Sequence, residues 1–316
     1  MKAVFLDTVT LGNDVDLGPL QAVTGGLTCH ERTTPEQVTE RLQGFDTVLV
    51  NKVVLGREHF EACPELRTIA VVATGLNNID LAAAQAFGIK VMNVTNYGRS
   101  TVAQHTMALI LALATRLLDY NRDARNGTWA KSDMFCLMDY PIMELEGKTL
   151  GIVGYGDLGQ GVAERARAFG MKIVLGCRPG QAPGEVDGYR RVPLDELLAQ
   201  ADVVSLHCLL TDDTRHMIGP RELGLMKSTA LLINTSRGGL VDEGALAEAL
   251  RNGDIAGAGF DVLTEEPPRH GNPLLAGDVP NLILTPHSAW ASREARQRIV
   301  GITADNLASV AVAPGN

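Results

Sequence analysis

The feature that most constrains the fold is a glycine-rich segment at residues 148–179, which predicts one strand–helix–strand unit. Its apolar run LGIV ends at Gly154, and Gly156 and Gly159 complete a G-x-G-x-x-G spacing before an Ala/Arg/Glu-rich helical stretch. Gly154 permits the sharp turn, Gly156 lets the backbone approach a pyrophosphate, and Gly159 allows close helix–strand packing. The helix N-terminus presents unpaired N–H groups to the phosphates. The segment therefore predicts a dinucleotide site, with an ordinary ligand-free turn as the alternative.

The end of the second strand bears on which dinucleotide binds. An acidic residue at that point holds a free ribose 2′-hydroxyl, whereas a nearby arginine accommodates a 2′-phosphate. Here the strand runs into Cys177 and Arg178, with no carboxylate until Glu185. Arg178 favours NADP(H), NAD(H) stays possible, and a solvated surface arginine is the alternative. The acidic Asp157 in the glycine loop has no explanation from the sequence.

Length and composition narrow the class of protein. With 316 residues and 45% hydrophobic content, the chain can bury a large core and form two domains. Its net charge of −9 disfavours a nucleic-acid binder. The five cysteines lack C-x-x-C spacing, so no disulfide framework and no metal site are predicted. They are Cys29, Cys63, Cys136, Cys177 and Cys208.

Membrane insertion and export are not expected. The start MKAVFLD lacks the apolar core of a signal peptide, and the apolar run at 107–118 is shorter than the about 20 residues that span a bilayer. We expect a soluble, cytoplasmic protein with reduced thiols.

Short strands at 3–6, 47–50, 69–73 and 91–94 alternate with helical stretches, which predicts a parallel sheet. Thr34, with a proline after it and a glutamine three residues on, marks one helix start. Ligands lie at the carboxyl ends of such strands. Asn51 and Lys52 follow one strand, and Thr74 and Gly75 follow another, so these four are candidate substrate contacts, with ordinary loop residues as the alternative.

A long helical pattern is predicted from Ser100 to about Asn126. Its middle is apolar nearly all round, so several of its sides must be buried. This indicates an interdomain or subunit interface and hence a homodimer. His105 is expected to be a packed, hydrogen-bonded histidine rather than a cofactor neighbour. Residues 129–143 are expected to form an aromatic, irregular loop.

Six strands are predicted between 150 and 285, the number in a complete doubly wound dinucleotide-binding domain. The expected fold is therefore α/β, with two domains that are each a doubly wound parallel sheet. A flavodoxin-like substrate domain would comprise 1–98 and 290–316, because the last helix is expected to return to the first domain. A Rossmann domain would comprise 99–289.

Three residues with complementary chemistry follow predicted strand ends. Arg237 follows LLINTS, Glu266 follows GFDVLT with one residue between, and His287 follows LILTP. A guanidinium binds a carboxylate bidentately and polarises an adjacent carbonyl. A histidine donates the proton that carbonyl reduction needs, and a carboxylate beside it orients the ring and favours imidazolium. Each has an ordinary structural alternative, but together they indicate reduction of a 2-keto acid.

The chain resembles the D-isomer-specific 2-hydroxyacid dehydrogenases over almost its whole length. The resemblance rests on GYGDLG, NTSRGGLVDEGALAEAL, AGAGFDVLTEEPP and LTPHSAWASREA. The segments NKVVL, ATGLNNIDL and the loop ending in FCLMDYP look most like the glycerate dehydrogenase or hydroxypyruvate reductase branch.

The resemblance implies that Arg237 binds the substrate carboxylate and carbonyl, Glu266 supports His287, and His287 is the acid/base. It also implies that the backbone near Thr74 and Gly75 binds the carboxylate and that Asp261 faces the nicotinamide amide. His287 and Trp290 are further candidate substrate contacts. The other candidate cofactor contacts are Asp157, Leu158, Cys177, Cys208, Thr214, Thr235 and His287.

The expected reaction is reduction of hydroxypyruvate or glyoxylate to the D-hydroxy acid. Branch members commonly have an acidic residue where this chain has Cys177 before Arg178, so NAD specificity does not carry over. Formate dehydrogenases have Gln at the position of Glu266, which disfavours that activity. A dehydrogenase for a bulkier keto acid and a dinucleotide-sensing corepressor-like protein are the alternatives.

Overall fold

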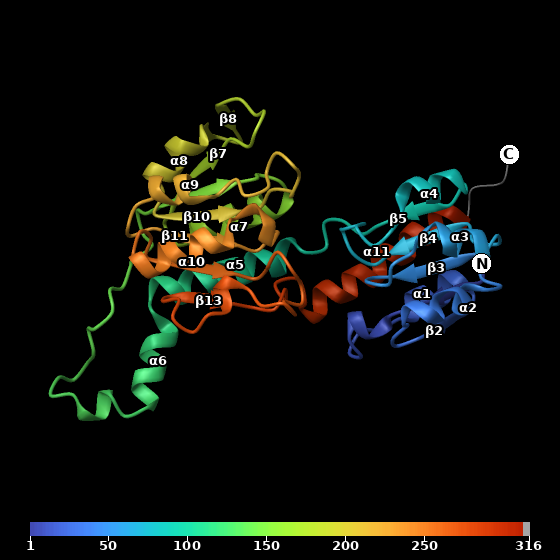
Figure 1. Ribbon diagram of the computed structural model, residues 1–316, viewed down its shortest axis with the longest axis horizontal. Helices are drawn as coiled ribbons and strands as arrows, with labels where there is room; N and C mark the ends of the chain where they lie inside the picture. Colours follow the sequence, from blue (N-terminus) through green and yellow to red (C-terminus); the bar gives the residue numbers. More distant parts are fainter. Residues whose placement is uncertain (312–316) are drawn as a thin grey trace. The chain divides into compact units, whose positions relative to one another are not determined.

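The computed structural model describes residues 1–311. The chain divides into two compact units, one of Met1–Gly98 with the segment from Ala291 onward and one of Arg99–Trp290. Both are α/β units built on largely parallel sheets, which confirms the expected fold class (Figure 1).

The first unit has a five-stranded parallel sheet in the order β2-β1-β3-β4-β5. This is the order of flavodoxin-like folds. Its strands are β1 Ala3–Phe5, β2 Leu27–Cys29, β3 Thr47–Val50, β4 Thr68–Val71 and β5 Lys90–Met92. Its helices are α1 Gly18–Thr24, α2 Val38–Leu42, α3 Arg57–Ala62, α4 Leu81–Ala86 and α11 Arg293–Ala311, with short 3-10 turns η1 Thr8–Leu11 and η2 Pro35–Gln37.

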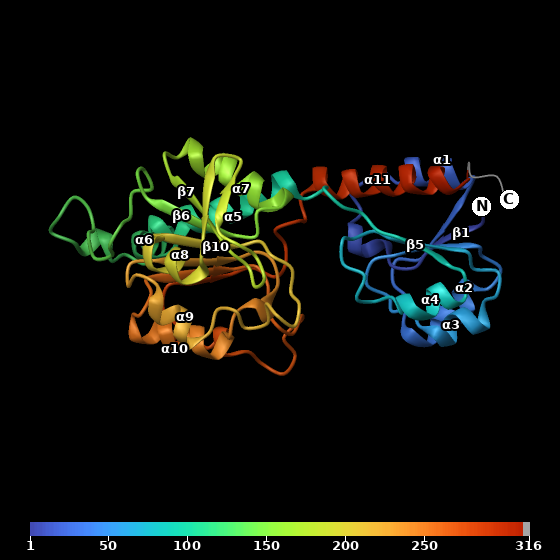
Figure 2. The ribbon, with the colours of Figure 1, turned by 90° about the horizontal axis from the view of Figure 1, so that it is seen from above.

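Helices cover both faces of this sheet. Figure 2 shows α1 and α11 on one face and α2, α3 and α4 on the other. Arg296 of α11 binds the segment that precedes α1, because its guanidinium donates to the carboxylate of Asp14 and to the carbonyl oxygen of Leu11 at the end of η1. Thr34 forms the predicted capping box with Gln37, although the turn it opens is η2 rather than an α-helix.

The second unit has an eight-stranded sheet in the order β13-β12-β11-β10-β6-β7-β9-β8. Its strands are β6 Thr149–Val153, β7 Lys172–Gly176, β8 Gly184–Val186, β9 Tyr189–Val192, β10 Val203–Leu206, β11 Leu231–Asn234, β12 Gly257–Phe260 and β13 Leu282–Leu284. Its helices are α5 Arg99–Ala114, α6 Leu117–Arg125, α7 Asp157–Ala168, α8 Leu194–Gln200, α9 Pro220–Leu225 and α10 Glu243–Asn252, with 3-10 turns η3 Trp129–Lys131, η4 Gly238–Leu240 and η5 Pro273–Leu275.

The strand order changes direction between β6 and β10, which is the point where doubly wound sheets bind ligands. Two apolar cores lie on opposite faces of the sheet. One packs α5 and α7 against it, and the other packs α8, α9 and α10.

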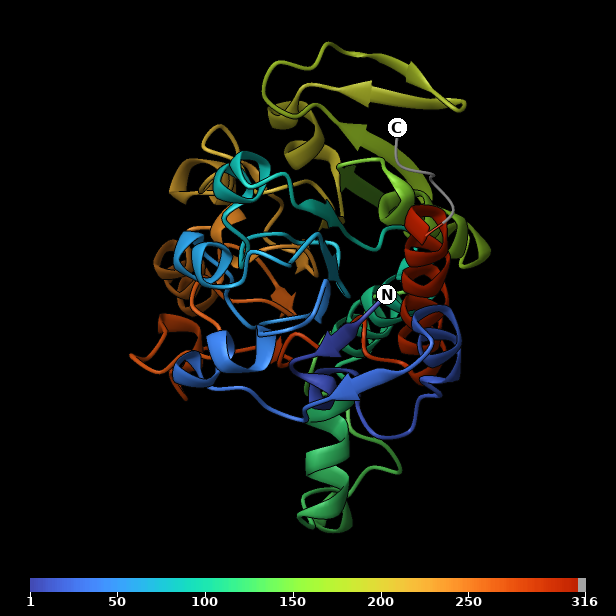
Figure 3. The same cartoon turned by 90° about the vertical axis from the view of Figure 1, so that its right-hand side faces the viewer.

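The predicted strand count needs correction. All six expected strands between 150 and 285 form, and the sheet is extended by a hairpin of β8 and β9, with β9 parallel to β7 and β8 antiparallel to β9 (Figure 3). Similarly, β2 extends the first sheet. These strands were missed because they are short and mostly exposed, so no apolar run marks them.

The prediction of a single helix from Ser100 to Asn126 is also wrong. The chain breaks between α5 and α6, where Arg116 takes a left-handed backbone with φ 53°, and the two helices are bent by 59°. The apolar residues of α5 pack in the core of their own unit, whereas Leu117 and Leu118 of α6 are exposed. Within residues 1–311, no single helix is long and apolar enough to cross a membrane, and only the bent pair α5–α6 meets that test of length and composition.

Candidate active site

The glycine turn is built as its spacing predicts. Gly154 has φ 100°, and a Cβ there would lie 2.5 Å from main-chain atoms of His207 and Cys208 at the end of β10. A Cβ on Gly159 would collide with the carbonyl oxygen of Gly154, so this glycine lets α7 approach β6. By contrast, the Cβ position of Gly156 faces open space, which leaves its backbone accessible to a ligand.

A cavity of about 340 Å³ opens at the carboxyl ends of β6, β7 and β10. The glycine turn forms one wall, and the polar side chains that line the cavity include Arg178, Gln181, Arg191 and His207. Among residues 1–311, no Asp or Glu lines this cavity. An open glycine turn beside two guanidinium groups fits a dinucleotide.

Arg191 and His207 are among the cavity residues that were missed from the sequence. Arg191 lies on β9, inside the unpredicted hairpin. His207 follows β10 directly, a strand-end position that could have indicated it. Its Nε2 lies 2.8 Å from the hydroxyl oxygen of Ser205, and its buried Nδ1 has no partner in the described residues. Burial lowers the pKa of His207 from 6.5 to about 4, which keeps its ring neutral.

The structure brings only part of the expected cofactor set to this cavity. Gly154, Gly156, Arg178 and Cys208 line it. Thr214 binds the carbonyl oxygen of Leu209, and the Thr235 hydroxyl lies 3.0 Å from that of Thr106. The candidates outside its lining are Asp157, Leu158, Gly159, Cys177, Thr214, Thr235, Asp261 and His287.

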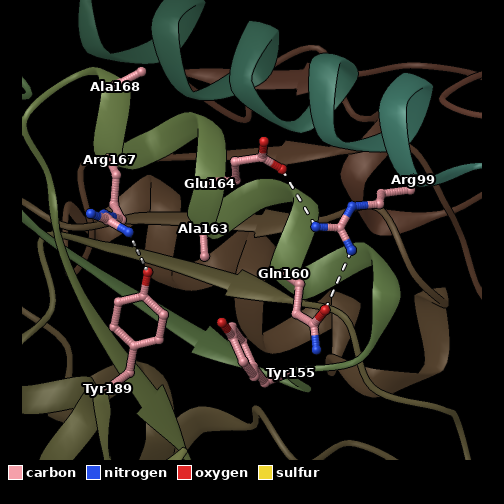
Figure 4. Close-up of a pocket in the computed structure, with 8 residues that line it drawn as sticks. All are labelled: Arg99, Tyr155, Gln160, Ala163, Glu164, Arg167, Ala168 and Tyr189. Carbon is pink, nitrogen blue, oxygen red and sulfur yellow. Dashed lines mark hydrogen bonds and ion pairs between the residues drawn. The ribbon is translucent and has the colours of Figure 1, made fainter. Parts of the chain in front are cut away.

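The unexplained Asp157 has a partner in the structure. Its Oδ1 accepts a hydrogen bond from Nη1 of Arg99 at 3.3 Å, and the same guanidinium binds Gln160 and Glu164. Figure 4 shows this arginine at a second cavity, of about 460 Å³, on the outer face of α7. The acidic residue at the start of α7 is therefore neutralised by Arg99, and it also lies where the helix dipole favours a negative charge.

His287 and Glu266 form the closest acid–base pair at these strand ends. Nδ1 of His287 lies 2.6 Å from Oε2 of Glu266, and the two side chains are about one-third exposed. The other carboxylate oxygen of Glu266 accepts the backbone N–H of Leu263 at 2.8 Å. Burial raises the pKa of Glu266, but the His287 hydrogen bond, the Leu263 N–H and the charge of Arg237 outweigh it, so the net pKa is lowered.

Arg237 sits in a turn that two buried features shape. Asn234, at the end of β11, binds the carbonyl oxygen of Arg237 through its side-chain amide and accepts the N–H of Ser236. Gly238 lies so close to the backbone of Leu263 that any Cβ would collide with it. This contact keeps the Arg237 turn against the segment that holds Glu266.

The first unit positions its own candidates separately. The buried Asp7 carboxylate accepts the backbone N–H groups of Asn51 and Lys52, which fixes the turn after β3. Oδ1 of Asn51 is buried and has no partner in the described residues. The Thr74 hydroxyl donates to the carbonyl oxygen of Val94.

Comparison with known proteins gives a consistent family. A sequence model described as "D-isomer specific 2-hydroxyacid dehydrogenase, NAD binding domain" matches residues 107–289. The chain is 49% identical to a glycerate dehydrogenase of Methylorubrum extorquens over 284 residues, which are 90% of this chain and 88% of that protein. It is 39% identical to a hydroxypyruvate reductase of Blautia hydrogenotrophica, with 97% of this chain and 96% of the relative covered.

A solved structure has a similar fold. An acyclic imino acid reductase in complex with NADPH and D-Arg superposes with a TM-score of 0.81 at 30% identity, over 95% of this chain and 94% of that one.

Proposed function

The chain belongs to the D-isomer specific 2-hydroxyacid dehydrogenase family, and from that premise we propose that it reduces hydroxypyruvate or glyoxylate to the D-2-hydroxy acid. The observation that supports this most strongly is the His287–Glu266 pair beside Arg237. When bound, the nicotinamide cofactor supplies the hydride for the carbonyl carbon. The protein must supply the proton and hold the substrate.

His287 delivers that proton from Nε2. Glu266 is an acceptor at Nδ1, so Nδ1 carries a hydrogen in both charge states of the ring, and the proton that moves is the one on Nε2. Loss of this proton to the new alkoxide leaves a neutral imidazole. The charge of Glu266 stabilises the imidazolium before the transfer and holds the ring in one orientation.

Arg237 binds the substrate carboxylate and polarises the adjacent carbonyl. Its guanidinium is exposed, and its only hydrogen bond within residues 1–311 goes from Nη1 to the carbonyl oxygen of Ser236. The remaining donors match the fork geometry of a carboxylate. Asn51, Lys52, Thr74, Gly75 and Trp290 stay proposed substrate contacts.

NADP(H) is the proposed cofactor, held by the 99–290 unit. Arg178 and Arg191 line the same cavity, and an acidic side chain for a ribose 2′-hydroxyl is missing from the part of its lining that the structure describes. Two guanidinium groups suit a 2′-phosphate better than a neutral ribose. The remaining unit is the proposed substrate domain.

A homodimer is also proposed. The sequence predicted the whole 100–126 stretch as its contact surface, and we now propose α6 and the segment after it instead. This part projects from the rest of its unit (Figure 1) and exposes large apolar side chains. They are Leu117, Leu118, Trp129, Met134, Phe135, Met138 and Ile142. Phe135 is 88% exposed, and contact with a second copy of the chain would bury this apolar side chain. The free cysteines favour a cytoplasmic location, which stays a proposal.

A panel of 2-keto acids tested with both NADPH and NADH is the direct experiment. We expect the highest kcat/KM for hydroxypyruvate or glyoxylate with NADPH. Preference for a bulky keto acid would replace the proposed substrate, and no turnover with any keto acid would contradict the proposed activity.

A further inference from the structure

His287 has an unusual backbone. Its φ is 51°, in the left-handed region that non-glycine residues adopt rarely. Such a conformation persists only where the surroundings hold it. The segment from Thr285 to Ala289 therefore needs a fixed set of partners, and these determine where the imidazole points.

One residue, Asp261, provides most of these partners. It is 1% exposed and directly follows β12. Its carbonyl oxygen accepts the N–H of His287 at 2.8 Å. Its carboxylate accepts the N–H of Ser288 at 2.9 Å and the N–H of Ala289 at 2.8 Å. Three consecutive backbone donors thus end on a single residue.

The carboxylate of Asp261 is itself held from the core. Its Oδ1 accepts the hydroxyl of Thr285 at 2.5 Å, and Nε2 of His105 lies 2.9 Å from the same hydroxyl oxygen. A carboxylate only accepts hydrogen bonds, so the Thr285 hydroxyl donates to Asp261 and accepts from His105. His105 therefore carries its hydrogen on Nε2.

These contacts form a chain from helix α5 to the loop of His287. His105 belongs to α5, which is packed in the core of its unit. On the other side of the loop, Thr101 of α5 donates its hydroxyl to the carbonyl oxygen of Ala289. The loop is anchored to one rigid helix at two points. Hydrogen bonds in such a chain polarise and strengthen one another.

We propose that Asp261, Thr285 and His105 are positioning residues that keep His287 in its left-handed conformation and aim its imidazole at Glu266. The inference rests on the proposed role of His287 as the acid/base. It gives Asp261 a task separate from the expected nicotinamide contact, because three of its about four acceptor positions are filled by protein donors. The nicotinamide contact stays a prediction.

The test compares Thr285→Val, which removes the hydroxyl, with Thr285→Ser, which retains it. Thr115→Val is the matched control, since among residues 1–311 the Thr115 hydroxyl binds only the carbonyl oxygen of Leu111 in α5. We expect Thr285→Val to lower kcat by at least about 10-fold, because a misplacement of about 1 Å can cost about 10²-fold. In Thr285→Val the KM for the keto acid should stay within about twofold of the wild-type value. Thr285→Ser should keep a kcat close to that of the wild type.

A spectroscopic readout separates positioning from loss of fold. The imidazole ¹⁵N and ¹H signals of His287, assigned with His287→Gln, should shift in Thr285→Val and return in Thr285→Ser. His105→Leu provides a second break in the chain and should shift the same signals. Wild-type kcat and unchanged His287 signals in both Thr285→Val and His105→Leu would overturn the inference, as would a Thr285→Ser variant that behaves like Thr285→Val.

The proposed function and this inference can fail separately. Wild-type turnover in His287→Gln would contradict the proposed acid/base role, and the positioning would then be judged on the imidazole signals alone. Loss of turnover in His287→Gln, with no change in Thr285→Val, would leave the proposed function standing and overturn the positioning.

Discussion

Nδ1 of His287 lies 2.6 Å from Oε2 of Glu266, although 21 positions separate the two residues in the sequence. The pair forms because both residues follow neighbouring strands of one parallel sheet, β12 and β13. Glu266 is held by the backbone N–H of Leu263, and His287 by the carbonyl oxygen of Asp261. Each partner is fixed by its own loop, so the hydrogen bond costs little further ordering.

Replacement of Arg237 by lysine should lower kcat/KM for the keto acid by about 10²-fold or more. Lysine keeps the charge but loses the planar fork that binds a carboxylate bidentately. Steady-state kinetics should show a fall in kcat together with a rise in KM, because the guanidinium acts on both the carboxylate and the carbonyl. A change in KM alone would contradict the role of Arg237 in polarising the carbonyl.

Removal of the two cavity arginines should change cofactor preference. In Arg178→Ala and Arg191→Ala, affinity for NADPH should fall by about 10- to 100-fold, the value of one charged hydrogen bond to phosphate. Affinity for NADH should change little. Fluorescence titration of the protein with each cofactor measures both. Equal losses for NADPH and NADH would mean that neither side chain meets a 2′-phosphate.

His207, a partly buried residue whose Nδ1 is enclosed, should make the free energy of unfolding depend on pH. Burial lowers the pKa of His207 from 6.5 to about 4, so in this window the unfolded chain binds a proton that the folded protein does not. The stabilising contribution of neutral His207 is present above pH 6.5 and is lost as the pH falls toward 4. Between about pH 7 and 4.5, the Tm of the wild type should therefore fall more than that of His207→Gln. If Tm fell with pH by the same amount in the two proteins, a contribution of His207 to the pH dependence of stability would be excluded.

The parts of the fold that could be predicted are those with a local signal. Buried strands such as β6 and β10 read as apolar runs, and the glycine spacing marks the turn between β6 and α7. The break at Arg116 has no glycine or proline to mark it. The strands β2 and β8 are short and exposed, so their pairing depends on the sheets beside them.

The candidate site can likewise be divided into residues with a local sequence signal and contacts without one. Arg237, Glu266 and His287 could be proposed because each follows a strand, and such ends meet at one edge of a parallel sheet. The contacts that hold the candidate site residues in place could not be predicted. Arg99 beside Asp157, His105 beside Thr285, and Gly238 against Leu263 are contacts between distant segments, which only the folded chain brings together.

The most direct measurement of the central claim is the single-turnover rate of hydroxypyruvate reduction by His287→Gln, followed by NADPH absorbance in a stopped-flow experiment. The glutamine keeps a polar side chain but cannot act as the acid. With NADPH binding verified by fluorescence, the rate should fall by at least about 10²-fold, the usual contribution of a general acid. A rate close to that of the wild type would contradict proton donation by His287.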